Sequence, residues 1–220
     1  MIKAVLFDFN GTLFQDAAIN KEIWKKILNE LTNNKIDFES FYSEFSNTHN
    51  HLIINEIRKR YLNNKEIDVD YWSNKKEDTY KNYCLQHNLK QMTPGAEEFL
   101  NYLKENNIKI GLCTSSIIGN VNFYYKNLNL YRWFTMEHTI YDTGEYDSKS
   151  KMYLDCAKSF EENIKDCLII EDSPRAIFQA IKAGCKKIIA IKNEETKNLE
   201  YEEIKQTINN FNELDYSILD

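Results

Sequence analysis

The chain carries acidic and hydroxyl side chains directly after several short apolar runs. Asp8 follows IKAVLF, the pair Thr114-Ser115 follows IKIGLC, and the pair Glu171-Asp172 follows CLII. A carboxylate can attack phosphorus as a nucleophile, a small hydroxyl can bind a phosphate oxygen, and further carboxylates can hold Mg²⁺. These residue types therefore favour phosphoryl transfer that depends on a divalent metal, provided that the fold brings them together.

A lysine completes such a site because its charge stabilises the oxygens of a transferring phosphate. The segment YDSKSKMY lies between the second and the last of these runs and contains Lys149 and Lys151. Both lysines stand next to the start of a helical pattern. The sequence thus provides the nucleophilic acid, the hydroxyl, the lysine and the acidic pair in one chain.

The apolar runs predict the strands of a parallel sheet. They occupy residues 2–7, 108–113, 167–170 and 187–191. None alternates cleanly between apolar and polar residues, which is typical of strands buried on both faces. Helical patterns separate the later runs, and this alternation predicts an α/β fold with a doubly wound parallel sheet of the Rossmann type. Ligands bind beyond the carboxyl ends of the strands in such sheets.

Two of the expected helices have clear start and stop signals. The segment PGAEEFLNYLKENN places Pro94 at the first helical position. The segment SPRAIFQAIKAG places Ser173 as the N-cap, Pro174 in the first turn and Gly184 as the stop. From Asn193 onward we expect a helix and a short tail.

A long segment after the first predicted strand does not continue the alternation of strands and helices. It contains no convincing strand, and pieces such as INKEIWKKILNEL and HLIINEIRKRYL read as amphipathic helices. Such a segment is too long for a crossover connection and has too many apolar faces for a disordered loop. We therefore expect a core domain made of residues 1–15 and 92–220, with a helical domain inserted at residues 16–91.

Composition and charge exclude several classes of protein. The net charge is −6 and there is no long basic run, so nucleic acid is a poor candidate partner. No stretch approaches the roughly 20 apolar residues of a membrane span, and the N-terminus lacks the features of a secretion signal. We expect a cytoplasmic protein that is a monomer or weak dimer. The five cysteines include no C-x-x-C pair, and we expect buried free thiols.

The motifs, in their order and spacing, resemble those of the haloacid dehalogenase superfamily. The residues that carry the resemblance are DFNGTL, LCTSS, a lysine ahead of a helix, and LIIEDSPRAIFQAIKAG. The likeness covers essentially the whole predicted core and is strongest to the beta-phosphoglucomutase and small phosphatase branch. The helical insertion falls where this superfamily carries its cap domain.

The resemblance implies a role for each matching position. Asp8 corresponds to the nucleophile that forms an aspartyl-phosphate. The implied Mg²⁺ ligands are Asp8, the backbone carbonyl of Asn10 and Asp172, with Glu171 as a further ligand or a supporting acid.

The substrate's phosphate has its own implied set of contacts. Thr114 and Ser115 correspond to the hydroxyls that bind it, and backbone amides near Gly11 and Thr12 assist. Lys149 matches the phosphate lysine best, but KSKMY lacks both prolines of the common K-P-x-P-D form, so Lys151 stays open. The expected substrate is a small phosphorylated metabolite.

Asn10 departs from the pattern of the superfamily's phosphatases, which usually have an aspartate there. That aspartate protonates the leaving oxygen and then activates water. An amide can do neither near neutral pH. The loss of general acid–base help typically costs ~10²–10⁴-fold, or roughly 3–5 kcal/mol of barrier. This loss of rate should be largest for alkyl esters, because acyl and aryl phosphates have leaving groups that need less protonation.

Several explanations of Asn10 stay open. The first is a natural phosphatase that is tuned to good leaving groups or relies on a residue of the cap as its acid. The second is an engineered or degenerate form that binds phosphate without turnover. The third is a member that cleaves phosphonates or carbon–halogen bonds. The dehalogenases need no metal, and the Glu171-Asp172 pair argues against them. Phosphonate cleavage would need a lysine from the inserted domain, for which Lys21, Lys25 and Lys26 are available.

A sugar-phosphate mutase is disfavoured. Asn20 stands where the mutase carries a histidine, and the segment SNTHNHL does not match its Gly-x-x-Arg loop. The sequence therefore predicts a Mg²⁺-dependent hydrolase of small organic phosphates, with a non-catalytic phosphate-binding protein as the opposing class.

Overall fold

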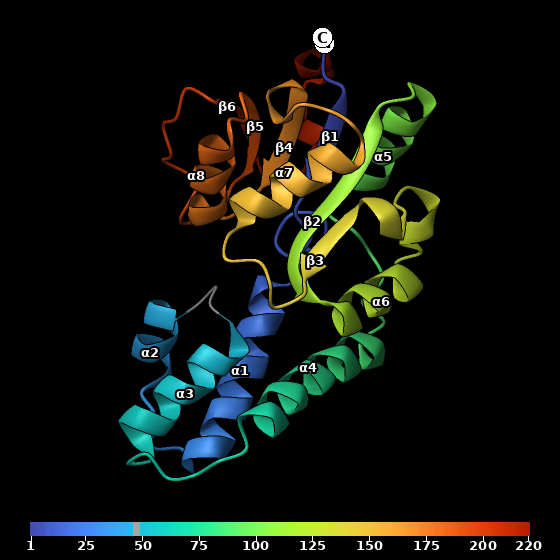
Figure 1. The fold of residues 1–220 in the computed structure, drawn as a ribbon. Helices are drawn as coiled ribbons and strands as arrows, with labels where there is room; N and C mark the ends of the chain where they lie inside the picture. Colours follow the sequence, from blue (N-terminus) through green and yellow to red (C-terminus); the bar gives the residue numbers. More distant parts are fainter. Residues whose placement is uncertain (46–48) are drawn as a thin grey trace. The chain divides into compact units, whose positions relative to one another are not determined.

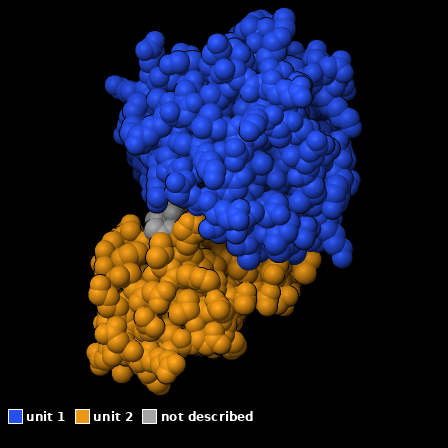
Figure 2. Space-filling view, viewed as in Figure 1, with its two compact units in different colours: residues 1–15, 90–220 blue, residues 16–89 orange. Residues whose placement is uncertain are grey.

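The computed structural model describes residues 1–45 and 49–220 and contains two compact units. One unit comprises residues 1–15 and 90–220, and the other comprises residues 16–89. Figure 2 colours the two units separately. The segment SNTHNHL begins with residues 46–48, which lie outside the described residues.

The larger unit is built on a six-stranded sheet with the strand order β3-β2-β1-β4-β5-β6 (Figure 1). Every neighbouring pair of strands is parallel, so all strands end at the same edge. The strands are β1 (Ala4–Phe7), β2 (Lys109–Ile117), β3 (Thr139–Asp142), β4 (Cys167–Glu171), β5 (Lys187–Ile191) and β6 (Ile204–Ile208). This is the predicted α/β fold with a doubly wound parallel sheet, and β1, at its centre, carries Asp8 directly after its last residue.

Helices cover both faces of this sheet. They are α5 (Ala96–Glu105), α6 (Ile118–Asn127), α7 (Lys149–Ser159) and α8 (Pro174–Ala183), and single 3₁₀ turns occupy 130–132, 136–138, 164–166, 211–213 and 216–219. Successive side chains of a strand point to opposite faces. Leu6 accordingly joins the apolar core formed with α7 and α8, whereas the Phe7 ring packs against Phe99 of α5.

The helix signals in the sequence act largely as expected. Ser173 caps α8 by accepting a hydrogen bond from the Ala176 amide, Pro174 is its first residue, and Gly184 ends it in the left-handed conformation. Pro94 differs from the expectation because α5 begins at Ala96, after a left-handed Gly95 that supplies the N-cap position. Pro94 therefore belongs to the turn before the helix.

The smaller unit consists of helices α1 (Ala17–Thr32), α2 (Phe38–Phe45), α3 (Asn50–Tyr61) and α4 (Val69–Gln86). Its apolar core includes Ile27, Leu28 and Ile57, all fully buried. A polar contact is buried as well: the Tyr80 hydroxyl of α4 donates to the Asp16 carboxylate over 2.6 Å. Since a buried carboxylate needs such donors, this bond ties α4 to the start of α1.

The prediction of a helix after Asn193 is wrong. This region forms strand β6 and two 3₁₀ turns. Residues 204–208 alternate between half-buried and exposed positions until the buried Ile208, which is the pattern of an edge strand with one face on the core. Strand β3 was not predicted either, because its four residues include a single fully buried one, Thr139.

The five cysteines are free and buried, as the sequence predicted. Burial raises the pKa of Cys84 and Cys185 to about 11 and that of Cys167 to about 12. Because the thiolate is the reactive form, we expect iodoacetamide at about pH 8 to leave these thiols unmodified in the native chain. The same reagent in denaturant should modify all five cysteines. Mass spectrometry would read the result, and rapid native alkylation would contradict this burial.

No helix within residues 1–45 and 49–220 is both long enough and apolar enough to cross a membrane.

Candidate active site

Asp8 lies at the carboxyl end of the central strand and is buried, with 6% of its surface exposed. Its backbone N–H donates to the carbonyl of Ile170 over 3.0 Å, which continues the pairing of β1 with β4. Burial raises the pKa of the Asp8 carboxyl to about 7, although the Lys149 charge opposes this shift. A bound cation would favour the anionic form further, and that form is the nucleophilic one.

Lys149 is the lysine that reaches Asp8. Its ammonium donates to Asp8 Oδ1 and, over 2.6 Å, to Glu171 Oε1. Burial alone would lower the pKa of Lys149, but the two carboxylates outweigh it and the pKa lies above its ordinary value. Lys151 is exposed and lies over the Tyr146 ring, 5.5 Å from its centroid. The first residue of α7 thus contacts the acidic residues, whereas the lysine two positions later does not.

Glu171 is buried, and each of its two oxygens accepts two hydrogen bonds. Oε2 accepts from the backbone amides of Asp172 and Ser173 over 2.8 and 2.9 Å. Oε1 accepts from Lys149 and from the Tyr153 hydroxyl, the latter over 2.8 Å. A carboxylate offers about four acceptor positions, so this carboxylate is fully hydrogen-bonded in the structure.

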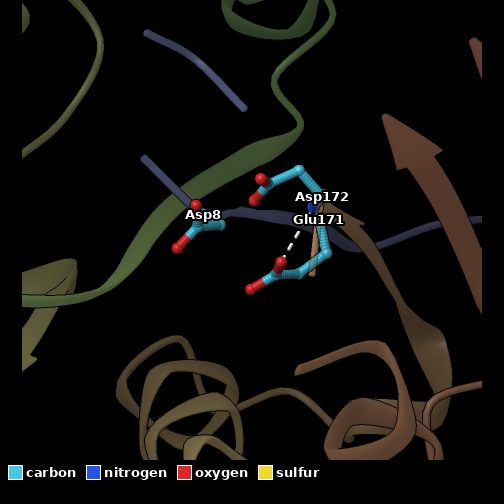
Figure 3. A group of neighbouring side chains, drawn as sticks. All are labelled: Asp8, Glu171 and Asp172. Atoms are coloured by element: carbon cyan, nitrogen blue, oxygen red, sulfur yellow. Dashed lines mark hydrogen bonds between the residues drawn. The ribbon is translucent and has the colours of Figure 1, made fainter. Parts of the chain in front are cut away.

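Asp8, Glu171 and Asp172 form an acidic cluster (Figure 3). One carboxylate oxygen from each residue lies within 4.8 Å of the others. Hard divalent cations such as Mg²⁺ prefer oxygen donors of this kind, so the donor chemistry fits such an ion. Since Glu171 already accepts four hydrogen bonds, its geometry favours the role of a supporting acid over that of a direct ligand.

A tight turn after β1 carries Gly11 and Thr12. The Gly11 amide donates to the Phe14 carbonyl over 2.7 Å, and its φ of 82° lies in the left-handed region. The Thr12 hydroxyl donates to Asp172 Oδ1 over 3.4 Å and thereby links the turn to the residue that follows β4. A Cβ atom at Gly11 would overlap the Asp172 carboxylate.

We therefore expect Gly11→Ala to be destabilising. The substitution combines a left-handed backbone, which costs a residue with a side chain ~1–2 kcal/mol, with displacement of the Asp172 carboxylate. Urea unfolding should show a loss of this size or more, together with weaker metal binding. The matched control is Gly119→Ala in α6, where a Cβ meets nothing within 4 Å. Equal stability of the two variants would contradict the expectation.

Hydrogen bonds hold the Asn10 side chain at both its amide nitrogen and its amide oxygen. Its amide nitrogen donates to the Tyr124 hydroxyl over 3.1 Å, and its amide oxygen accepts from the Ser116 hydroxyl over 2.9 Å. The Tyr124 ring stacks on Phe9 with centroids 4.1 Å apart. The amide is thus held by β2 and α6 in an orientation that uses both its donor and its acceptor.

The two hydroxyl residues predicted to follow the second apolar run, Thr114 and Ser115, differ from each other in solvent exposure. β2 extends to Ile117, so Thr114 and Ser115 lie within the strand rather than after it. Thr114 is buried and its hydroxyl accepts from the Ser116 amide over 3.1 Å, while Ser115 is exposed. The strand's pairing with β3 shifts between Cys113 and Ile117, which is where these hydroxyls stand.

Three residues around the candidate site were not singled out from the sequence. Tyr153 follows Lys149 by four positions, and residues at this spacing share one face of a helix, so the spacing was a usable signal. Ser116 continues the LCTSS motif and could have been included with its neighbours. Tyr124 carries no comparable signal, because nothing in its local sequence relates it to Asn10.

Comparisons with known proteins identify the family. The haloacid dehalogenase-like hydrolase family model matches residues 2–184. The chain belongs to this family. A protein from Bacillus subtilis (strain 168) named "Putative phosphatase YhcW" is 25% identical over 227 residues, which cover 100% of this chain and 96% of the relative.

Solved structures of other proteins have the same fold as this chain. A family IA, variant 3 hydrolase from Entamoeba histolytica superposes with a TM-score of 0.86 at 27% identity, covering 99% of this chain and 97% of the other. A beta-phosphoglucomutase from Clostridium difficile gives 0.78 at 23% identity, covering 99% and 95%. The resemblance seen in the sequence is confirmed, and the chain is a phosphatase-like hydrolase of this family.

Proposed function

We propose that this chain is a Mg²⁺-dependent hydrolase of small organic phosphates that works through an aspartyl-phosphate on Asp8. The observation that carries the proposal is the contact of the Lys149 ammonium with both Asp8 and Glu171, beside the Asp172 carboxylate. These groups come from the ends of β1 and β4 and the start of α7. The closeness of these carboxylates and the ammonium supports the roles proposed for them, a nucleophile, a phosphate-binding cation and a metal-binding cluster.

The first chemical step is attack by an Asp8 oxygen on phosphorus. The new oxygen–phosphorus bond forms as the bond to the leaving oxygen breaks, and the leaving group departs with the electron pair as an alkoxide, a phenoxide or a carboxylate, which takes any proton it needs from water. Lys149 has three N–H groups, and two of them bind carboxylates among the described residues. The third can donate to a phosphate oxygen, and Thr114 and Ser115 supply hydroxyls on the neighbouring strand.

The second step returns Asp8 to its starting form. Water attacks the phosphorus of the aspartyl-phosphate, inorganic phosphate leaves, and the carboxylate is restored. Asn10 is held by Tyr124 and Ser116, and its amide can orient groups through hydrogen bonds without taking up a proton. Both steps therefore lack a side chain at position 10 that transfers protons.

A Mg²⁺ ion bound by Asp8, Asp172 and the Asn10 carbonyl would supply positive charge between the phosphate and the carboxylates. Glu171 would support this arrangement through its bonds to the amides of Asp172 and Ser173. Gly11 leaves room for the Asp172 carboxylate, since any larger residue would collide with it. The donor set of this chain is therefore suited to the ion.

Substrate selection is assigned to the helical unit of residues 16–89, which we propose acts as a cap. Two of the three lysines considered for phosphonate chemistry make contacts that do not favour that reaction. Lys21 pairs with Glu39 over 2.7 Å on an exposed surface, and the Lys25 ammonium lies 6.0 Å from the centre of the Phe38 ring. These contacts are typical of a solvated helix face.

The proposal is tested by phosphate release from acetyl phosphate, p-nitrophenyl phosphate and a panel of sugar and nucleotide monophosphates. We expect release from the activated phosphates in Mg²⁺, loss of release in chelator, and weak release from alkyl esters. A parallel calorimetric titration with inorganic phosphate distinguishes a hydrolase from the opposing class, a protein that binds phosphate without catalysis. Phosphate binding without release from any substrate would make the chain a non-catalytic phosphate-binding protein.

A further inference from the structure

The hydroxyl of Tyr153 is buried beside the site, and the proposed reaction does not use this hydroxyl. It lies on α7 four residues after Lys149, and its side chain is fully buried. Its hydroxyl donates to Glu171 Oε1 over 2.8 Å. The Lys149 ammonium donates to the same oxygen over 2.6 Å and lies 5.7 Å from the centre of the Tyr153 ring. One carboxylate oxygen therefore has two donors from one helix.

The residue at this position differs from the one in the K-P-x-P-D form. In the K-P-x-P-D form the fifth residue is an acid, whereas KSKMY ends in tyrosine. An aspartate there would be an acceptor next to Glu171. Tyr153 is instead a neutral donor, and burial, followed by the charges of Glu171 and Asp8, raises its pKa well above the ordinary value, so it keeps its proton.

The shared oxygen matters when Lys149 binds phosphate. When the third N–H of Lys149 donates to a phosphate oxygen, the ammonium is shared among three acceptors and is drawn away from Glu171, so its bond to Glu171 weakens. A buried carboxylate oxygen left without a donor is costly. With Tyr153 in place, Oε1 keeps one hydrogen bond during this movement, and Oε2 keeps its two backbone donors.

We propose that Tyr153 is a positioning residue that holds Glu171 Oε1 and thereby releases Lys149 to bind the phosphate of the substrate. This inference rests on the proposed function, because it assigns Lys149 to the phosphate. Tyr153 touches neither substrate nor metal in this role. It acts through Glu171, and its contribution depends on the carboxylate being present.

The test compares Tyr153→Phe with the unaltered chain in calorimetric titration with inorganic phosphate in the presence of Mg²⁺. The phenylalanine keeps the ring and removes the hydroxyl. Loss of such a supporting partner typically costs 10–100-fold, so we expect phosphate to bind about tenfold or more weakly. The value of kcat/KM for acetyl phosphate should fall by a similar factor.

A matched control separates this role from a structural one. Tyr125 is also fully buried, and its hydroxyl contacts Thr139 and the Thr135 carbonyl rather than the acidic cluster. Tyr125→Phe should lower the unfolding temperature as Tyr153→Phe does, with phosphate binding unchanged. In a Glu171→Ala background, Tyr153→Phe should have little further effect, because the carboxylate through which Tyr153 acts is absent.

Two results would overturn the inference, and they can be told apart. If the unaltered chain binds phosphate and Tyr153→Phe binds it equally well, or loses the same factor with and without Glu171, Tyr153 does not position Lys149 and the proposed function stands. If the unaltered chain binds no phosphate at all, the proposed function fails and this inference fails with it.

Discussion

Replacing Asp8 with asparagine is expected to abolish phosphate release, with a loss of roughly 10⁴- to 10⁶-fold, the range measured when a catalytic nucleophile is removed. An amide oxygen is too weak a nucleophile to attack phosphorus. The buried carboxylate is also the partner of Lys149. The measurement is single-turnover release from acetyl phosphate in Mg²⁺, where slow product release does not hide the chemical step.

The Asp8→Asn variant should still fold. Asparagine has nearly the same volume, and Lys149 keeps its bond to Glu171, so the buried ammonium retains a carboxylate partner. Thermal unfolding of the variant and the unaltered chain provides the control for intact structure. A folded Asp8→Asn variant that releases phosphate at more than a hundredth of the original rate would exclude Asp8 as the nucleophile.

Replacing Asn10 with aspartate is expected to raise activity on alkyl phosphate esters by ~10²–10⁴-fold. The new carboxyl can protonate the leaving oxygen and then activate water. The local structure can accommodate it, because Ser116 and Tyr124 both carry hydroxyls that can donate to a carboxylate. The measurement is kcat/KM for a sugar monophosphate and for acetyl phosphate, with the ratio as the readout.

The ratio decides the role of position 10. Acetyl phosphate has a good leaving group, so its attack step should gain little from Asn10→Asp. Asn10→Ala is the control, since it removes the hydrogen bonds to Tyr124 and Ser116 without adding an acid. A gain of equal size on both substrates, or no gain on either, would contradict the claim that the amide sets the leaving-group preference.

The sequence predicted the parts of the sheet that are buried on both faces. Strands β1, β2, β4 and β5 carry continuous apolar runs, and such runs are sufficient evidence for central parallel strands. Strand β6 pairs with β5 at an edge and exposes alternate residues. A short half-exposed segment of this kind gains its structure from pairing rather than from its own composition, so a helix was the wrong expectation there.

The candidate site was predictable where residues follow strands directly. Asp8, Glu171 and Asp172 come within 4.8 Å of one another because β1 and β4 are neighbours and end at the same edge. The choice between Lys149 and Lys151 was not predictable, because it depends on which side of α7 faces Asp8. The partners of Asn10 come from β2 and α6, more than a hundred positions away in the sequence.

The most direct test of the central claim is to find the phosphoryl group on the chain. The unaltered protein would be mixed with acetyl phosphate and Mg²⁺, quenched, treated with borohydride to convert an acyl phosphate into an alcohol, and mapped by mass spectrometry. We expect homoserine at residue 8, and the slow second step that Asn10 imposes should raise its amount. Phosphate release without any modification of Asp8, or with the modification at another carboxylate, would contradict it.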